Sequence, residues 1–222
     1  MQRLQGFGAV FAIVAGLLLS GCATSRSEVS LASPAAGTTP SAPQASANAK
    51  PIVLRTVTDA RVFEAKPRDP SIPSLGFEGA PAATADVKAR AIGRKRNTYG
   101  MALGDVLLEP GDSIEQVVRK EVTEALREAG YRIVAAPAPA DVPVMDVRIG
   151  QFWSWIQPGF WAITVHTKIG TELVVPNRAP VLVDVANAES TMAATDGVWI
   201  DGVLKSLQRY RAAIVARKAD LP

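Results

Sequence analysis

The sequence predicts an α+β domain, with an antiparallel sheet of about four to five strands and two helices packed on one face. Strand-like runs and helical patterns occupy separate parts of the chain and do not alternate regularly. Between residues 144 and 186, successive strand patterns are joined by short links, which is typical of an antiparallel meander. Two other segments repeat apolar residues at helical spacing, so each would cover the sheet with one apolar side.

The chain begins with a pattern typical of a secretory signal peptide. Arg3 precedes an apolar run over residues 7–19, and small residues follow at positions 20 and 21. A positive start, a short apolar run and small residues before a cut describe a targeting segment that is removed from the mature protein. The run is shorter than the roughly 20 residues of a membrane-spanning helix. We therefore expect residues 1–21 to be a cleaved signal peptide.

Cys22 is the one cysteine of the chain and directly follows Leu19, Ser20 and Gly21. This ending resembles the lipobox of bacterial lipoproteins. The resemblance implies cleavage between Gly21 and Cys22, with acyl chains such as palmitate on the sulfur and amino group of Cys22. Two or more such chains hold a protein stably on a membrane. Because Ala23 and not an aspartate follows, the resemblance also implies the outer membrane, with the domain facing the periplasm or, alternatively, the cell surface.

Residues 22–50 are rich in Ala, Ser, Thr and Pro and contain no aromatic residue. Such a segment cannot bury enough apolar surface to offset the entropy that is lost on ordering. We expect it to be a disordered tether between the lipidated cysteine and a single domain over residues 51–222. The net charge of +3 is small and gives no reason to expect a nucleic-acid partner.

The first half of the domain predicts a strand, a long loop and a helix. Residues 52–57 are rich in β-branched side chains and predict a strand. Three prolines between residues 66 and 76 exclude a central strand or a helix, so we expect a loop that continues to about residue 85. Further on, Ser113 and Gln116 match a capping box and Gly130 fits a helix stop, so the segment between them predicts an amphipathic helix.

The second half predicts the meander and a final helix. Strand patterns occupy residues 131–134, 144–155, 160–175 and 181–186. Gln157, Pro158 and Gly159 form the turn between the two longest of them. Thr195 and Asp196 then cap a helix whose apolar stripe continues to Ile214.

Five aromatic residues crowd the turn of the longest hairpin, and all but Phe152 are candidate contact residues: Phe152, Trp153, Trp155, Phe160 and Trp161. Neighbouring residues of a strand point to opposite faces, so Trp153 and Trp155 share a face and Phe152 takes the other. Exposed aromatic side chains at a turn are typical of contact surfaces. The sequence leaves two interpretations open, a partner-binding edge or a core that the loop over residues 67–85 covers.

Arg94, Lys95, Arg96 and Tyr99 lie in a basic segment between Gly93 and Gly100, which suggests a loop or a hairpin tip. A run of cations is either a solvated surface or a site for an anionic partner. Lipid headgroups, lipopolysaccharide phosphates and glycan strands are the anionic partners that we consider for this segment.

The residues that carry familiar catalytic chemistry are sparse. His166 is the one histidine, and a lone histidine without cysteine cannot build a usual zinc site. The sequence contains no Gly-x-Ser-x-Gly elbow, phosphate-binding loop or dinucleotide fingerprint, and its carboxylates are scattered. We therefore predict no catalytic residues, no metal and no cofactor other than the acyl chains on Cys22.

Several segments resemble YajG-type lipoproteins of proteobacteria. These are Thr-Asp-Ala-Arg at residues 58–61, the basic segment at 94–100, Leu-Arg-Glu-Ala-Gly-Tyr at 126–131, and the aromatic stretch at 152–163. The likeness covers most of the domain after the expected tether. It implies an outer-membrane lipoprotein with a small α+β domain, and it brings no catalytic residues.

These observations together predict a non-enzymatic lipoprotein of the bacterial cell envelope, anchored through Cys22. Its domain would be a binding or assembly accessory for an envelope protein, with the aromatic turn and the basic segment as contact surfaces. The alternative is an accessory that binds lipid or peptidoglycan in envelope transport or maintenance.

Overall fold

The computed structural model describes residues 25–31, 48–77, 79–97, 99, 101–137, 139–192 and 195–222. The expected signal peptide at residues 1–21 and the expected lipidation site at Cys22 lie outside the described residues. Within the described ranges, the strands are β1 (Ser27–Val29), β2 (Lys50–Asp59), β3 (Ala91–Arg96), β4 (Ala102–Leu108), β5 (Tyr131–Ile133), β6 (Val144–Pro158), β7 (Ile163–Val174) and β8 (Val181–Thr191). The helices are α3 (Ala85–Arg90), α4 (Ile114–Glu128) and α5 (Asp196–Ala216).

The strands form one mixed sheet of eight strands, so the predicted antiparallel sheet of four to five strands is wrong. The pairs β1–β4, β2–β5, β2–β6 and β3–β6 are parallel. The expected meander is present, because β6, β7 and β8 pair antiparallel in sequence order. The error has a physical reason: side-chain alternation defines the faces of a strand but not its neighbours, and parallel partners lie far apart in the chain.

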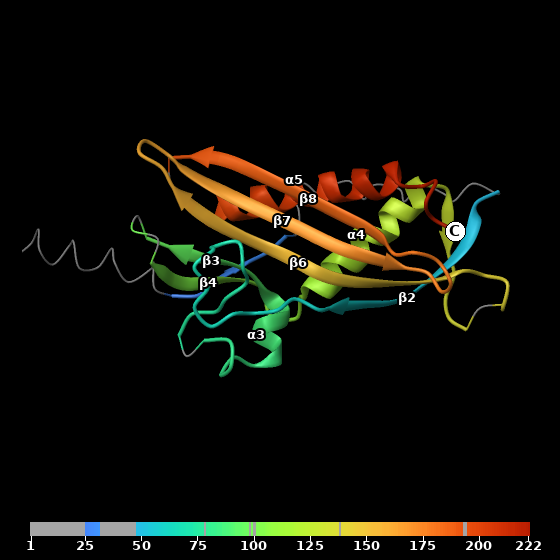
Figure 1. The fold of residues 1–222 in the computed structure, drawn as a ribbon, viewed down its shortest axis with the longest axis horizontal. Helices are drawn as coiled ribbons and strands as arrows, with labels where there is room; N and C mark the ends of the chain where they lie inside the picture. Colours follow the sequence, from blue (N-terminus) through green and yellow to red (C-terminus); the bar gives the residue numbers. More distant parts are fainter. Residues whose placement is uncertain are drawn as a thin grey trace, which may run out of the picture.

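The long strand β6 organises the sheet, as Figure 1 shows. On one side it pairs along its length with β7. On the other side β2 pairs with its first part, up to Asp59 opposite Ile149, and β3 pairs with its later part, where Gly93 lies opposite Ser154. The sheet therefore forks, with β2 and β5 in one branch and β3, β4 and β1 in the other.

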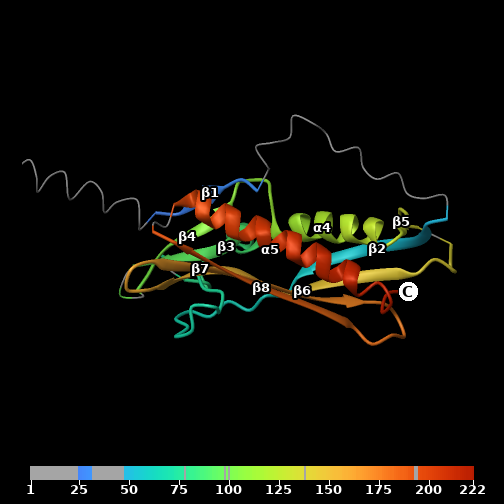
Figure 2. The ribbon, with the colours of Figure 1, turned by 90° about the horizontal axis from the view of Figure 1, so that it is seen from above.

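Helices α4 and α5 lie side by side over one face of the sheet (Figure 2). The Ser113 hydroxyl accepts a hydrogen bond from the Gln116 amide at 3.3 Å, which confirms the predicted cap of α4. Gly130 follows α4 with a φ of +95°, a conformation that favours glycine. The main core lies between these helices and the sheet and includes Trp199 and Tyr210 from α5, both fully buried. None of the described helices combines the length and the apolar character that a membrane span requires.

The opposite face of the sheet is partly covered by the proline-rich loop that precedes α3. Leu75, Leu107 and Trp153 belong to a second cluster of buried side chains on this face. The indole N–H of Trp153 donates to the Pro70 carbonyl at 3.2 Å, so the loop lies directly over this ring. A third helix, α3, lies at the end of this loop, whereas the sequence predicted two helices.

Strand β1 lies within residues 22–50, the segment expected to be a disordered tether. It pairs with β4, and Val29 is buried in the main core. Arg90 Nη1 donates to Glu28 Oε1 at 2.9 Å. The expected tether is therefore not continuous, because residues 27–29 belong to the folded domain. A strand of three residues is too short to show as a sequence pattern, and its partners lie about 80 positions away.

Candidate binding site

Three chain connections meet at one end of the sheet. Strands β3 and β6 run parallel towards this end, where the β3–β4 turn and the β6–β7 turn lie (Figures 1 and 2). Ile163 at the start of β7 lies opposite Thr191 at the end of β8, so β8 also ends there. We call this the hairpin end and define it by five side chains: Tyr99, Met101, Phe160, Trp161 and Met192.

The hairpin end concentrates exposed apolar side chains. Five of the eight large apolar side chains that are exposed in the described part of the chain belong to it. Their exposed fractions are 89% for Tyr99, 61% for Met101, 90% for Phe160, 81% for Trp161 and 83% for Met192. Phe160 and Trp161 meet edge to face, with ring centroids 4.8 Å apart. Such a concentration of apolar surface is typical of a contact site.

The structure separates the four aromatic residues that the sequence grouped as candidate contacts. Trp153 is buried beneath the proline-rich loop, so its prediction as a contact residue is wrong. Trp155 lies on the same face, as predicted, and is half-buried, stacked on His166 with centroids 5.0 Å apart. Phe160 and Trp161 lie in the turn beyond the strand and are exposed. The two open interpretations therefore each apply to part of the group.

The basic residues are also separated, because they lie on a strand and not in a loop. Arg94 and Arg96 of β3 share the face that the proline-rich loop covers. Lys95 points to the other face, where its Nζ donates to Ser27 Oγ at 2.5 Å and to the Ser25 carbonyl at 3.5 Å. Lys95 therefore holds the start of β1. The predicted hairpin tip is present, and Tyr99 lies in it.

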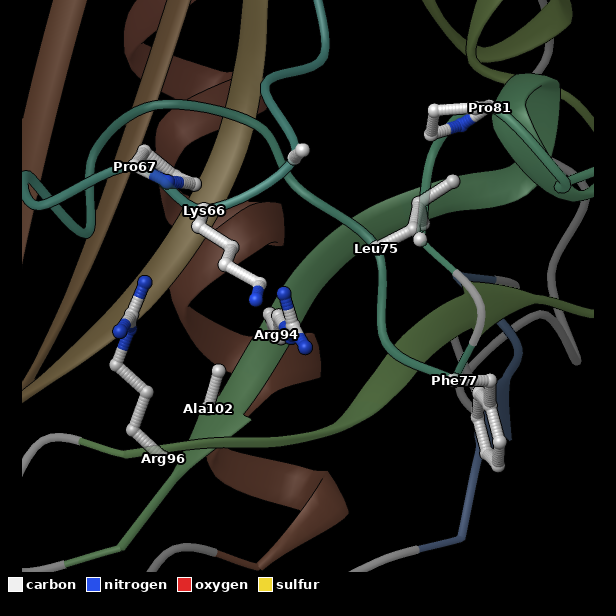
Figure 3. A pocket seen from close by; sticks show the side chains of 10 residues that line it. Lys66, Pro67, Leu75, Phe77, Pro81, Arg94, Arg96 and Ala102 are labelled. Carbon is white, nitrogen blue, oxygen red and sulfur yellow. The ribbon is translucent and has the colours of Figure 1, made fainter.

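Arg94 and Arg96 line a pocket of about 460 Å³ between the proline-rich loop and the β3–β4 hairpin. Figure 3 shows the Lys66 side chain extending towards Arg94 inside this pocket. Leu75, Phe77 and Pro81 provide apolar walls. Among the described residues that line it, three are cations and none is a carboxylate. Lys66 was not recognised from the sequence, because it lies in an irregular loop where no periodicity indicates its direction.

The pocket holds its two arginines in a partly desolvated environment. Burial lowers the pKa of Arg94, while the charge of Asp105 opposes this shift. Burial also lowers the pKa of Arg96, and repulsion from Arg94 lowers it further, while the charge of Asp69 opposes both effects. Arginine stays protonated in proteins, so the pocket keeps its positive charge at neutral pH. An anionic group that entered it would offset both the desolvation and the repulsion.

The buried carboxylate of Asp105 connects the loop that forms the pocket wall to Arg26, which directly precedes β1. Asp105 is fully buried on β4. Its Oδ1 accepts from the Gly76 amide at 2.7 Å, and its Oδ2 accepts from Arg26 Nε at 3.1 Å. The Arg26 guanidinium lies 4.5 Å from the centroid of the Phe77 ring. Arg26, directly before β1, is thus fixed beside the pocket.

Among the described residues, the environment of His166 is that of a packed side chain and not of a metal ligand. Its ring is stacked on Trp155, and burial lowers its pKa. Across the described ranges, no three His, Cys, Asp or Glu side chains are grouped closely enough to hold a metal ion.

No family model matches the sequence, and no curated protein matches it either. Among solved structures, the chain is similar to protein XCC0632 from Xanthomonas campestris, of the family-model DUF330, with a TM-score of 0.47 and 9% identity. That similarity covers 89% of this chain and 94% of the other. An uncharacterised protein is similar with a TM-score of 0.33 and 10% identity, over 78% of this chain and 99% of the other.

Proposed function

We propose that the protein is a lipid-anchored accessory protein of the bacterial cell envelope that acts by binding a partner. The observation that carries this proposal is β1, which integrates residues 27–29 into the sheet five positions after Cys22. The lipobox at residues 19–22 supports acylation of Cys22, and Ala23 supports the outer membrane with the domain in the periplasm. The resemblance to YajG-type lipoproteins supports the same location and stays a proposal.

The basic pocket supports binding rather than catalysis. Arg94 and Arg96 supply fixed charges, and an arginine does not exchange protons as a general acid or base does. The apolar walls from Leu75 and Phe77 would hold the part of a partner that adjoins its anionic group. We favour an envelope protein with an acidic segment as the partner. A second candidate is a lipid phosphate or a peptidoglycan carboxylate, which the same three cations favour.

Mass spectrometry of the protein purified from bacterial membranes tests the anchor. We expect the mature N-terminus at Cys22 to carry acyl chains, and the protein to stay in the membrane fraction in high salt. The control is Cys22→Ser, which removes the acylated thiol and should abolish both acylation and membrane retention. An unmodified Cys22 in the wild-type protein would contradict the proposal.

Photo-crosslinking in living cells tests the pocket. The probe replaces Phe77, whose exposed ring forms one wall, and a control probe replaces Leu182, which is exposed on β8. A discrete protein adduct at Phe77 alone that is lost with Arg94→Gln and Arg96→Gln supports a protein partner. An adduct to lipid or glycan with the same dependence supports the second candidate. The same yield at both probe positions, or no effect of the arginine substitutions, would overturn the pocket as the binding site.

A further inference from the structure

Residues 25–29 lead back along β1 towards the hairpin end. Strand β1 runs parallel to β4, so the chain traced backwards from Ser27 heads towards the β3–β4 turn. Ser25 is already beside β3, since its carbonyl accepts from Lys95 Nζ. Cys22 precedes Ser25 by three residues. Three residues span at most about 11 Å in any conformation, whereas a flexible tether over the whole of residues 22–50 would reach roughly 30 Å.

A lipid on Cys22 would therefore hold the hairpin end close to the membrane surface. The distance between Cys22 and the domain would increase if Arg26 left the domain, but Arg26 would then lose its ion pair with the buried Asp105. Arg90 holds Glu28, two residues further along β1, through a second ion pair. Contacts from Lys95, Arg90 and Asp105 thus hold residues 26–28 on the domain.

The side chains at the hairpin end suit a bilayer interface. Tyr and Trp combine an apolar ring with a polar group and are enriched at the level of lipid headgroups. Phe160 beside Trp161, with Met101 and Met192, adds apolar surface that water solvates poorly. Arg96 and Ala102, which flank the β3–β4 turn, also line the basic pocket. The cations of the pocket therefore lie next to the hairpin end. Cations at this position favour anionic headgroups.

We propose that the hairpin end is a bilayer-contact surface, on which Tyr99, Met101, Phe160, Trp161 and Met192 enter the interface of the membrane that carries the Cys22 anchor. This inference rests on the proposed acylation of Cys22. The anchor prevents the protein from leaving the membrane, and the hairpin end fixes its orientation. The ends of β3 and β6 and the start of β7 then face the bilayer, and the basic pocket opens beside the lipid headgroups.

Site-specific fluorescence in vesicles tests this orientation. The full mature protein is extracted from membranes and reconstituted in vesicles of phosphatidylethanolamine and phosphatidylglycerol. Because acylation blocks Cys22, an introduced cysteine is the one thiol available for an environment-sensitive dye. The test positions are Tyr99→Cys and Trp161→Cys. The controls are Val62→Cys and Leu182→Cys, which replace exposed apolar residues outside the hairpin end.

We expect dyes at the two test positions to shift their emission to the blue and to be quenched at least twofold more by headgroup-level lipid quenchers than dyes at the two controls. Leu182 is a strict control, because it lies nine residues from Thr191 along β8, roughly 30 Å away. Equal quenching at all four positions in acylated, vesicle-bound protein would overturn the bilayer contact and leave the anchor intact. Protein without acyl chains, detected by mass in the same samples, would overturn the anchor and this inference together.

Discussion

The Arg61 guanidinium lies against the Asp59 carboxylate, with Nε 2.9 Å from Oδ1 and Nη2 2.9 Å from Oδ2. Its remaining N–H groups donate to the Ala91 carbonyl at 2.6 Å, the Phe152 carbonyl at 2.9 Å and the Lys88 carbonyl at 2.8 Å. These acceptors lie where β2 leaves β6 and β3 joins it. Arg61 therefore connects β2, β3 and β6 at the fork through hydrogen bonds to backbone carbonyls of residues 88, 91 and 152.

Replacing Arg61 should strongly destabilise the domain. In Arg61→Met, the Asp59 carboxylate loses its guanidinium partner and three carbonyls each lose one hydrogen bond, and we expect the free energy of unfolding to fall by about 3–5 kcal/mol. Arg61→Lys should recover only part of this loss, because one ammonium cannot reproduce the planar fork. Urea unfolding measures both variants. The control is Arg68→Met at an exposed position, which should change stability by less than about 0.5 kcal/mol. An Arg61→Met variant as stable as this control would contradict the role of Arg61.

Gly93 should tolerate no side chain. A Cβ at this position would lie 2.7 Å from the Ser154 carbonyl oxygen and 2.9 Å from an atom of the buried Trp199 ring. We expect Gly93→Ala to lower the free energy of unfolding by about 1–3 kcal/mol, because β3 must move away from β6. Gly150→Ala is the matched control on β6, since its Cβ would meet no atom closer than 4.0 Å. Thermal unfolding of the two variants gives the comparison, and equal melting temperatures would show that β3 and β6 can separate at no cost.

Local features of the fold could be predicted from the sequence, and long-range ones could not. The ends of α4 depend on Ser113 and Gly130, which act on neighbouring backbone groups and are visible in a short window. The parallel pairing of β2 with β6 joins Leu54 to Met145, and no local pattern specifies a partner 91 residues away. The meander was predictable because its strands follow one another through short turns.

The candidate site shows the same limit. Alternation would have separated Lys95 from Arg94 and Arg96 if the segment had been recognised as a strand. Its glycines and positive charges suggested a loop instead. Lys66 reaches the pocket only because the proline-rich loop folds back over the sheet, and loop geometry has no period that a sequence reveals. The exposure of Phe160 and Trp161 follows from their place in the turn beyond β6.

Truncation of the aromatic residues should separate those in the core from those at the hairpin end. Trp153→Ala removes a fully buried ring and should cost about 3–5 kcal/mol of stability. Phe160→Ala and Trp161→Ala remove exposed rings and should change stability by less than about 0.5 kcal/mol. Thermal unfolding in the absence of membranes distinguishes the two groups. A loss of several kcal/mol for Trp161→Ala would place that ring in the core and contradict its exposure.

The ion pair between Arg55 and Asp146 should make stability depend on pH in the acid range. Hydrogen bonds from Arg55 and Thr56 lower the pKa of Asp146 from 3.8 to about 2. The pKa of Asp146 is lower in the folded state than in the unfolded state, so the charged carboxylate stabilises the fold. This contribution to the free energy of unfolding is fully present above about pH 5. It is lost as the pH falls from there through about 2, when the unfolded and then the folded carboxyl group take up protons.

Asp146→Asn tests this contribution, because the amide cannot ionise. We expect the variant to be less stable than the wild type by about 1 kcal/mol at pH 7, a modest value since the pair is partly exposed. The difference should shrink as the pH is lowered and be close to zero near pH 2, where Asp146 is largely protonated in the unfolded chain and half protonated in the folded domain. Urea unfolding of both proteins between pH 2 and pH 7 provides the measurement. A difference in stability that stays constant across this range would show that the effect of Asp146 does not come from its charge.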